Sequence, residues 1–157
     1  MTLRIGQGID VHPFSVDPGR RLVLGGVEIP GAPGLAGHSD ADVVTHALCD
    51  ALLGAAGLGD LGRHFPDTDP TLAGADSVGL LAEVVRRVAA VGFHPVNADC
   101  TVMAEAPKLS PHVDAMVAAL TATLGAPVSV KATRGEGMGA VGRGEGVACL
   151  AVVLVEA

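Results

Sequence analysis

The chain has 157 residues, of which 49% are hydrophobic and 17% are charged, and its formal net charge is −7. This composition is too apolar for a disordered protein, and the acidic balance argues against a general nucleic-acid surface. The longest apolar run, residues 147–155, is shorter than the about 20 residues that span a bilayer, and no signal-peptide core is visible, so we expect a cytoplasmic protein that binds neither nucleic acid nor membrane.

Alternating and helical hydrophobic patterns predict the following elements in chain order. They are strands over 3–11 and 21–29, a helix over 40–56, a loop over 58–76, a helix over 77–91, a strand over 96–104, a helix between 110 and 125, and strands over 127–133 and 146–156. Ser39, Ser77 and Ser110 are the expected N-caps of the three helices. A Gly25-Gly26 break in the second strand indicates a bulge or a hairpin.

The order of these elements sets the expected fold class. Two strands begin the chain and two end it, so strand and helix do not alternate regularly. We therefore predict an α+β fold with a mixed sheet and helices on one face. No linker or repeat divides residues 1–157, which we expect to form one domain.

Small residues dominate the composition. Glycine supplies 22 residues, whereas the only aromatics are three phenylalanines. Small side chains allow close approach between backbones and tight turns. Cys49, Cys100 and Cys149 are odd in number and lack a C-x-x-C spacing, which predicts buried thiols and no disulfide framework.

Three side chains are candidate metal ligands. Asp10 and His12 are two residues apart on a predicted strand, so both point to the same side. His46 lies on the first predicted helix among apolar neighbours, and Asp50 follows four residues later on the same helix face. Three ligands with an open fourth position are the pattern of a catalytic zinc. Polar residues at a strand end and a histidine in a core are the ordinary alternative.

The most glycine-dense segment, 131–146, is a candidate phosphate site. Its backbone N–H groups can surround phosphate oxygens, and Lys131 or Arg134 can add positive charge. Glu136 can hold a hard cation such as Mg²⁺ beside those oxygens. The alternative for this segment is a mobile hairpin tip.

Several short sequence motifs follow one another along the whole chain. They are Gly8-Ile9-Asp10-Val11-His12, His38-Ser39-Asp40-Ala41-Asp42-Val43, His46-Ala47, Asp50-Ala51-Leu52-Leu53-Gly54-Ala55, Gly59-Asp60-Leu61-Gly62, Phe65-Pro66-Asp67-Thr68-Asp69, Ala106-Pro107-Lys108 and Gly142-Arg143-Gly144-Glu145-Gly146. Together they resemble the 2-C-methyl-D-erythritol 2,4-cyclodiphosphate synthase family of the non-mevalonate isoprenoid pathway.

This resemblance implies an enzyme that is a homotrimer, with sheets packed around the three-fold axis and active sites between subunits. The implied substrate is 4-diphosphocytidyl-2-C-methyl-D-erythritol 2-phosphate, and the implied products are the cyclic diphosphate and CMP. The resemblance also implies Zn²⁺, or another divalent transition metal, on Asp10, His12 and His46. It further implies Mg²⁺ or Mn²⁺ at the diphosphate, with Glu136 as a ligand.

The resemblance also assigns roles to individual residues. His38 and Arg134 match catalytic positions. The implied substrate contacts are Asp10, His12, His38, Ser39, Asp60, Leu61, Gly62, Phe65, Pro66, Asp67, Thr68, Asp69, Ala104, Glu105, Ala106, Pro107, Lys108, Leu109, Ser110, Thr133, Arg134, Gly135, Glu136, Ala140 and Arg143. Among them, residues 60–62 and 65–69 match methylerythritol-binding loops, and 104–110 match a cytidine-binding loop.

The chain departs from the family pattern at two places. It has Thr133-Arg134-Gly135-Glu136 where Thr-Thr-Thr-Glu is common, so a guanidinium replaces a hydroxyl that contacts the transition state. Ala140 stands where a larger apolar residue is common. In the family this position lies near Arg143, beside an axial cavity that can hold an isoprenoid diphosphate.

Two other functions fit the same residues. The first is a zinc hydrolase that acts on phosphate esters through an activated water at the Asp-His-His site. The second is a trimeric ligand-binding protein without catalytic activity.

Overall fold

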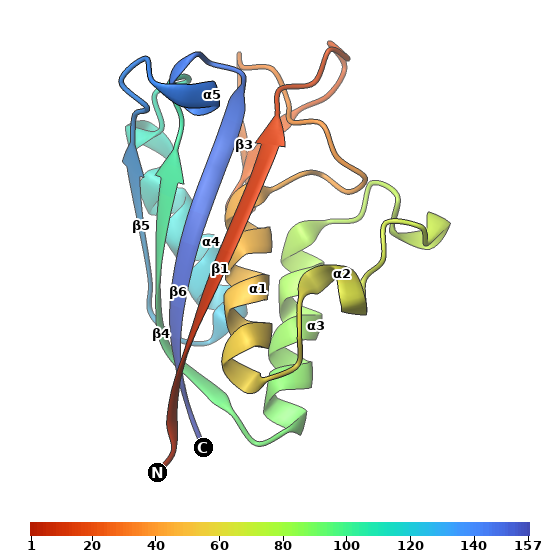
Figure 1. Ribbon diagram of the computed structural model, residues 1–157, viewed down its shortest axis with the longest axis vertical. Helices are drawn as coiled ribbons and strands as arrows, with labels where there is room; N and C mark the ends of the chain where they lie inside the picture. The colour runs from red at the N-terminus through yellow and green to blue at the C-terminus, as the bar shows by residue number, and fades with distance from the viewer.

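The computed structural model describes residues 1–157, and its main feature is a four-stranded sheet (Figure 1). The strands lie in the order β1 (Leu3–Pro13), β6 (Gly146–Glu156), β4 (His94–Met103) and β5 (Val128–Thr133). β4 and β5 run parallel, whereas the other neighbours run antiparallel. The predicted mixed sheet is therefore confirmed. The two C-terminal strands are not neighbours, because β6 inserts between β1 and β4.

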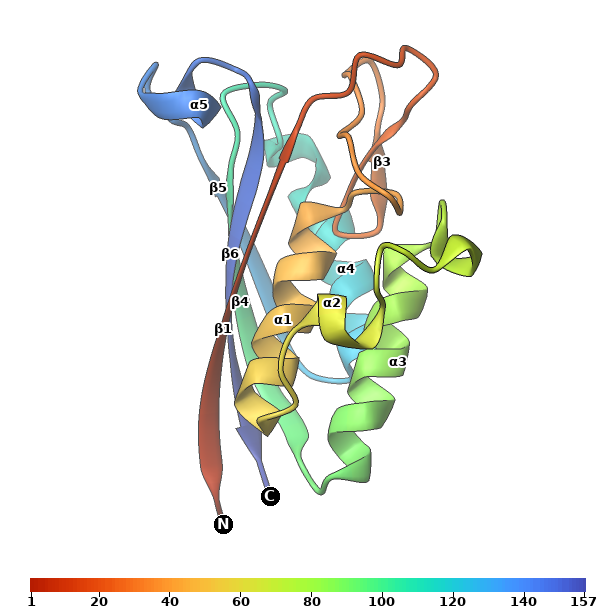
Figure 2. The ribbon, with the colours of Figure 1, turned by 45° about the vertical axis from the view of Figure 1, so that its right-hand side comes forward.

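Three long helices cover one face of this sheet (Figures 1 and 2). They are α1 (Val43–Ala56), α3 (Ser77–Ala90) and α4 (Val113–Leu124). The short elements are α2 (Leu61–His64), α5 (Gly139–Gly142), and the 3₁₀ turns Pro70–Leu72 and Ser110–His112. None of the helices has the length and apolar character that a membrane span requires. The prediction of helices on one face of a mixed sheet is confirmed.

The Gly25-Gly26 break is the turn of a hairpin. It joins β2 (Leu22–Leu24) to β3 (Val27–Ile29), which pair antiparallel as a separate small sheet. Gly25 and Gly26 have φ angles of 57° and 74°. Two successive positive φ angles are typical of the two-residue turns that match the twist of a hairpin.

Helix α1 lies directly on β1, and glycines in the strand make this contact possible. A Cβ built on Gly6 or Gly8 would lie 1.9 Å from the carbonyl oxygen of Ala51 or Ala47. Most of α1 is fully buried because it lies between the sheet and α3. The small residues of the sequence thus bring a strand and a helix close enough for their side chains to share one site.

The first helix begins later than predicted. Ala41 has a φ of 56°, in the left-handed region, so a helix cannot run through it, and α1 begins at Val43. Its N-cap is Asp42, not Ser39. Asp42 is fully buried, and its carboxylate accepts from the backbone N–H groups of Val44 and Thr45 at 3.1 and 3.0 Å.

The other two predicted N-caps are also wrong. Asp76 caps α3, which makes Ser77 its first helical residue and frees the Ser77 hydroxyl for other contacts. Ser110 begins a 3₁₀ turn. Helix α4 follows this turn, and no side chain caps its N-terminus. The predicted ends at Gly57 and Gly125 are confirmed, since both have a left-handed conformation after the last helical residue.

Asp42 joins α1 to the β2–β3 hairpin, and we expect its removal to be costly. Besides the two cap bonds, its carboxylate accepts from Gly25 and Gly26 N–H at 2.8 and 2.7 Å and from Thr45 Oγ1 at 2.7 Å. An Asp42→Ala change would lower the free energy of unfolding by ~4 kcal/mol, because a cap is lost and buried N–H groups lose their acceptor. Urea denaturation measures this loss. Asp76→Ala, which removes an exposed cap, should cost only ~1 kcal/mol, and equal losses for the two variants would contradict this account.

The three long helices leave the second face of the sheet uncovered (Figure 2). Alternate residues of β1 point to this face, and Ile5, Ile9 and Val11 are 74%, 58% and 62% exposed. Val152 of the neighbouring strand β6 is 44% exposed. These four side chains form an apolar stripe, which is a feature of surfaces that bind another protein.

Candidate metal centre and substrate cavities

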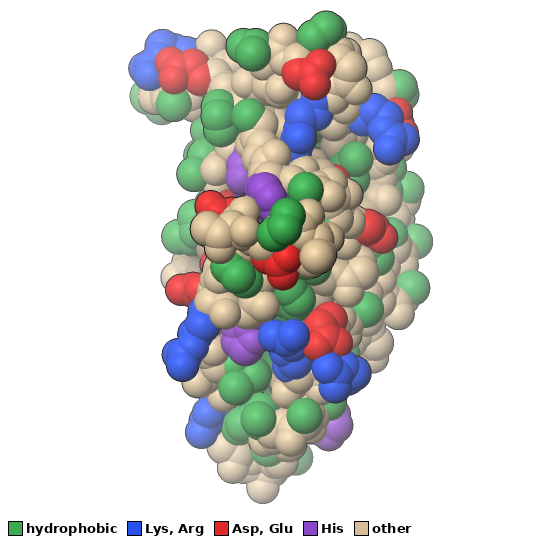
Figure 3. Space-filling model, turned by 90° about the vertical axis from the view of Figure 1, so that its right-hand side faces the viewer, with side chains coloured by type: hydrophobic (Ala, Val, Ile, Leu, Met, Phe, Trp, Pro, Cys, Tyr) green, Lys and Arg blue, Asp and Glu red, His purple; other side chains and the backbone are tan.

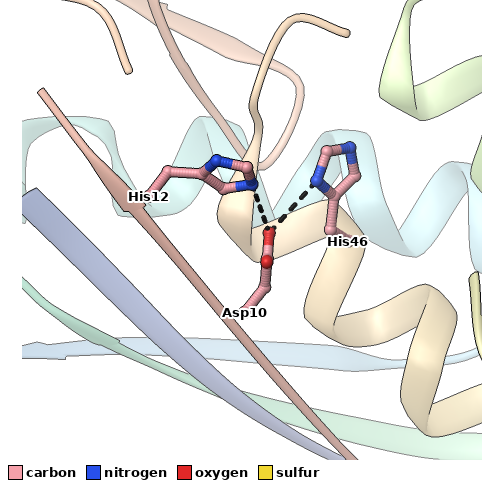
Figure 4. A group of neighbouring side chains, drawn as sticks. All are labelled: Asp10, His12 and His46. Carbon is pink, nitrogen blue, oxygen red and sulfur yellow. Dashed lines mark hydrogen bonds and ion pairs between the residues drawn. The ribbon is translucent and has the colours of Figure 1, made fainter. Parts of the chain in front are cut away.

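Asp10, His12 and His46 converge on one point (Figure 4). Asp10 and His12 point to the same side of β1, as their spacing predicts, and this side faces α1. His46 faces them from the first turn of α1. Asp10 Oδ2 lies 3.1 Å from His12 Nε2 and 3.1 Å from His46 Nδ1. One ligand atom from each residue lies within 4.8 Å of the other two. The sequence therefore identified this cluster correctly.

The outer ring nitrogen of each histidine already has a hydrogen-bond partner. His12 Nδ1 lies 2.7 Å from the carbonyl oxygen of Ala36, which can only accept, so this nitrogen carries the proton. His46 Nε2 lies 2.7 Å from Ser77 Oγ and 3.2 Å from Ser39 Oγ. A proton on each outer nitrogen leaves the inner nitrogen free, with its lone pair, to bind a metal ion beside Asp10.

These lone pairs favour a cation at the centre of the cluster. A carboxylate oxygen and two unprotonated nitrogens repel one another unless a proton or a metal ion lies between them. Without a metal ion, a proton on the inner nitrogen of each ring can donate to Asp10. Burial alone would raise the pKa of Asp10, but these hydrogen bonds with His12 and His46 outweigh it and lower that pKa to about 2. The hydrogen bond to Asp10 raises the pKa of His12. The donor set of one carboxylate and two imidazoles suits a divalent transition metal.

The metal cluster lies in an open cavity of about 700 Å³, here called the first cavity. Figure 3 looks onto this side of the molecule, where histidine and acidic side chains emerge between apolar and backbone atoms. Predicted site residues in this cavity are Asp10, His12, His38, Ser39, His46, Asp60, Leu61, Gly62, Phe65, Pro66 and Asp67. The structure adds four lining residues that were not predicted as site residues, which are Gly37, Asp50, Leu72 and Leu80.

Asp50 fixes the loop that forms one wall of the first cavity. Its Oδ1 accepts from the backbone N–H of Leu61 at 2.6 Å, at the start of α2. Burial raises the pKa of Asp50, with nearby Asp60 and Asp10 adding to the effect. The sequence could have identified Asp50 as a site residue, since it lies one helical turn after His46 on the same face.

A second set of contacts holds the far end of the same loop. His64 Nε2 lies 2.9 Å from the carbonyl oxygen of Leu58. On the other side of the ring, Arg87 Nη1 of α3 lies 2.7 Å from His64 Nδ1. The same guanidinium lies 4.8 Å above the ring of Phe65. The predicted sugar-binding loop is therefore attached to α3.

A second cavity of about 460 Å³ lies where β4 and β5 end. It is lined by Ala104, Glu105, Pro107, Lys108, Leu109, Ser110, Ala132, Thr133 and Arg134. Arg134 forms an ion pair with Glu105, and the hydrogen bond lowers the pKa of this glutamate. The other Glu105 oxygen, Oε2, is buried and has no hydrogen-bond partner. Predicted residues that line neither cavity are Thr68, Asp69, Ala106, Gly135, Glu136, Ala140 and Arg143.

The two cavities lie at opposite edges of the sheet. The first lies beside β1 and the second at the end of β5, and these are the two edge strands of the order β1-β6-β4-β5 (Figure 1). The structure thus brings the predicted residues into two separate groups.

Comparisons with known proteins agree with the geometry. The model of the YgbB family matches residues 3–156. A 2-C-methyl-D-erythritol 2,4-cyclodiphosphate synthase of Ralstonia nicotianae is 58% identical, over 99% of this chain and 93% of that protein. One from Symbiobacterium thermophilum is 60% identical, over 96% and 97%.

The chain belongs to the YgbB family of 2-C-methyl-D-erythritol 2,4-cyclodiphosphate synthases. It is therefore a cyclising enzyme of the non-mevalonate pathway, and the resemblance seen in the sequence is confirmed. Family membership favours this activity over a zinc hydrolase and over a protein that only binds ligands.

Solved structures of this synthase family share the fold. The bifunctional IspDF from Campylobacter jejuni superposes with a TM-score of 0.92 and 43% identity over 98% of this chain, which spans 42% of that longer protein. A synthase described as the CDP-bound form has a TM-score of 0.87 and 40% identity, over 98% of this chain and all of that one.

Proposed function

We propose that this synthase closes a ring within its substrate, 4-diphosphocytidyl-2-C-methyl-D-erythritol 2-phosphate. An oxygen of the 2-phosphate forms a bond to the β-phosphorus, and the bond from that phosphorus to the oxygen bridging it to the α-phosphorus breaks, so CMP leaves with the electron pair. The observation that carries this proposal is the convergence of three metal-ligating atoms in the first cavity, beside His38 and Ser39. The nucleophile belongs to the substrate, so no protein nucleophile is required.

The first cavity would hold the sugar and the reacting phosphates. When bound by Asp10, His12 and His46, Zn²⁺ or another divalent transition metal supplies Lewis-acid stabilisation to a phosphate oxygen. His38 and Ser39, which line the same cavity, would position the phosphates and stabilise developing charge. Residues 60–62 and 65–69 would bind methylerythritol. Glu136 is the proposed ligand of Mg²⁺ or Mn²⁺ at the diphosphate.

The second cavity would hold the cytidine through the loop of residues 104–110, with Thr133 and Arg134 beside its phosphates. The related synthase described as CDP-bound supports a nucleotide site in this family. Arg134 lines this cavity, and we propose that it neutralises phosphate charge where the family commonly has a threonine hydroxyl. Its ion pair with Glu105 limits its freedom, which would reduce the entropy lost on contact with phosphate.

We also propose that the whole chain acts as one synthase domain in a cytoplasmic homotrimer. The substrate carries its cytidine and its sugar at opposite ends, whereas the two cavities lie at opposite edges of one sheet. A three-fold arrangement brings the β5 edge of one subunit to the β1 edge of the next. The apolar stripe on the uncovered sheet face would be buried there, and Ala140 and Arg143 would lie by an axial cavity for an isoprenoid diphosphate.

The trimer proposal predicts the effect of placing a charge in the apolar stripe. An Ile9→Asp variant should elute as single chains of 15.6 kDa instead of assemblies of three times that mass, because a buried unpaired carboxylate is costly. It should keep its metal site and lose cyclisation. The control is Val91→Asp, at the exposed end of α3. Light scattering measures both masses, and an unchanged mass for Ile9→Asp would refute the proposed interface.

Co-expression of two inactive variants tests where the active site lies. His38→Ala damages the first cavity, and Lys108→Ala damages the second. If each site combines both cavities from neighbouring chains, every mixed trimer contains one intact site in three, and purified mixed trimers should release CMP at roughly a third of the wild-type rate. No recovery in purified mixed trimers would place both cavities' functions on the same chain.

A further inference from the structure

We propose that Ser77 and Asp40 act as positioning residues, which hold His46 in the one tautomer that can bind a metal. This inference deepens the proposed function, because it rests on the metal centre of Asp10, His12 and His46. It concerns a hydroxyl on α3 and a carboxylate before α1, neither of which contacts the substrate in the proposed scheme. We call the chain of contacts from His46 through Ser77 to Asp40 the relay.

The relay is short, and its central residue is buried. Ser77 is fully buried as the first residue of α3. Its Oγ lies 2.7 Å from His46 Nε2 and also hydrogen-bonds Asp40 Oδ1. The second oxygen of Asp40 accepts from the Ser77 backbone N–H at 3.0 Å. Both Asp40 oxygens therefore hold Ser77, and Ser77 in turn holds the imidazole.

The chemistry of these groups fixes the position of each proton. An ionised carboxylate can only accept hydrogen bonds, so the Ser77 hydroxyl has to donate its single proton to Asp40. Ser77 Oγ is then left as an acceptor for the ring, and His46 Nε2 has to carry the ring proton. Nδ1, which faces Asp10 at 3.1 Å, is left with its lone pair for a metal. This is the outer-shell arrangement that orients metal-ligating histidines.

Ser39 is a weaker partner of the same nitrogen. Its Oγ lies 3.2 Å from His46 Nε2, compared with 2.7 Å for Ser77, and it also accepts from the Ala41 backbone N–H at 3.3 Å. Ser39 also lines the first cavity, where the proposed function gives it a substrate contact. The shorter bond and the carboxylate behind it make Ser77 the main support of His46.

The relay also ties the metal centre to the end of the substrate loop. The Gly74 N–H donates to the His38 carbonyl at 3.0 Å, and the Asp40 N–H donates to the Ala75 carbonyl at 3.3 Å. Together with the Asp40–Ser77 bonds, these contacts fasten the residues before α3 to the segment that carries His38. Removal of the relay should therefore loosen His46 and weaken metal binding without changing any ligand.

The test compares Ser77→Ala with wild type in two measurements. Competition with a chromophoric chelator should show a 10–100-fold loss of Zn²⁺ affinity. Nitrogen NMR of the metal-free protein should show a proton on His46 Nε2 in wild type, whether or not Nδ1 also carries a proton beside Asp10. In the variant, Nε2 should be partly unprotonated. The control is Thr45→Val, which removes another buried hydroxyl–carboxylate bond at the start of α1 that does not touch His46. It should lower stability but keep the Zn²⁺ affinity of the folded protein.

Asp40→Asn extends the test to the end of the relay. An amide can donate to Ser77 Oγ, which would turn the hydroxyl proton toward His46 and favour the wrong tautomer. If both residues act through the relay, the double variant should lose no more Zn²⁺ affinity than the weaker-binding single variant. Unchanged affinity and tautomer in Ser77→Ala, or additive losses in the double variant, would overturn the inference. Wild type that shows the Nε2 tautomer but binds no Zn²⁺ would instead refute the proposed metal centre and leave the relay supported only as a structural contact.

Discussion

His46→Ala is expected to lose its bound metal and at least roughly 10³-fold in the rate of cyclisation. The change leaves only Asp10 and His12 as ligands, and two ligands are too few to hold a catalytic zinc. Lewis-acid stabilisation contributes several kcal/mol to a phosphoryl transition state, and each 1.4 kcal/mol corresponds to a factor of about ten in rate. Elemental analysis of the purified protein measures the metal, and CMP release measures the rate.

The matched control for this prediction is His94→Ala. His94 is exposed at the start of β4, away from both cavities, so its removal should change neither the zinc content nor the rate. If His46→Ala retains full zinc content and full activity, the assignment of the metal centre is wrong.

Gly8→Ala should disrupt the contact between β1 and α1 and lower the free energy of unfolding by at least ~3 kcal/mol, or Tm by roughly 10 °C. The added Cβ would lie 1.9 Å from the Ala47 oxygen and 2.7 Å from the Ala51 nitrogen. Both are backbone atoms of α1, so no side chain can move aside. The helix has to shift as a whole, which would also carry His46 away from Asp10. Thermal unfolding followed by circular dichroism measures the effect.

Gly79→Ala should have the opposite effect on the free energy of unfolding. Gly79 is exposed within α3, and the nearest atom to an added Cβ is 3.9 Å away. Alanine should therefore stabilise the protein by ~0.5–1 kcal/mol through its higher helix propensity. A Gly8→Ala variant that unfolds at the wild-type temperature would show that the strand and the helix are not held as closely as described.

The sequence predicted those features of the fold that depend on local periodicity. The i, i+2 spacing of Asp10 and His12 placed both on one side of β1, and Gly25-Gly26 indicated a bulge or a hairpin, which proved to be a hairpin. The helix starts were wrong because they depend on contacts distant in sequence. The carboxylate of Asp42 is buried because it accepts hydrogen bonds from the Gly25 and Gly26 N–H groups of the hairpin. The local sequence before the helix does not indicate these bonds.

In the candidate site, too, the residue types were predicted from the sequence, but the contacts between distant residues were not. The three metal ligands were predicted because their residue types are rare in a strand and an apolar helix. Ser77 was predicted as a cap, but its hydroxyl supports His46, which is 31 residues away in sequence. The sequence also did not reveal the Glu105 partner of Arg134, because this ion pair depends on β4 and β5 ending side by side.

The central claim is that the chain closes a diphosphate ring within its substrate. Phosphorus NMR of the enzyme with 4-diphosphocytidyl-2-C-methyl-D-erythritol 2-phosphate, Zn²⁺ and Mg²⁺ follows every phosphorus atom directly. We predict that CMP and the cyclic diphosphate appear in equal amounts as the substrate disappears, with no inorganic phosphate. Inorganic phosphate, or CMP with an open-chain product, would contradict intramolecular attack and indicate a hydrolase.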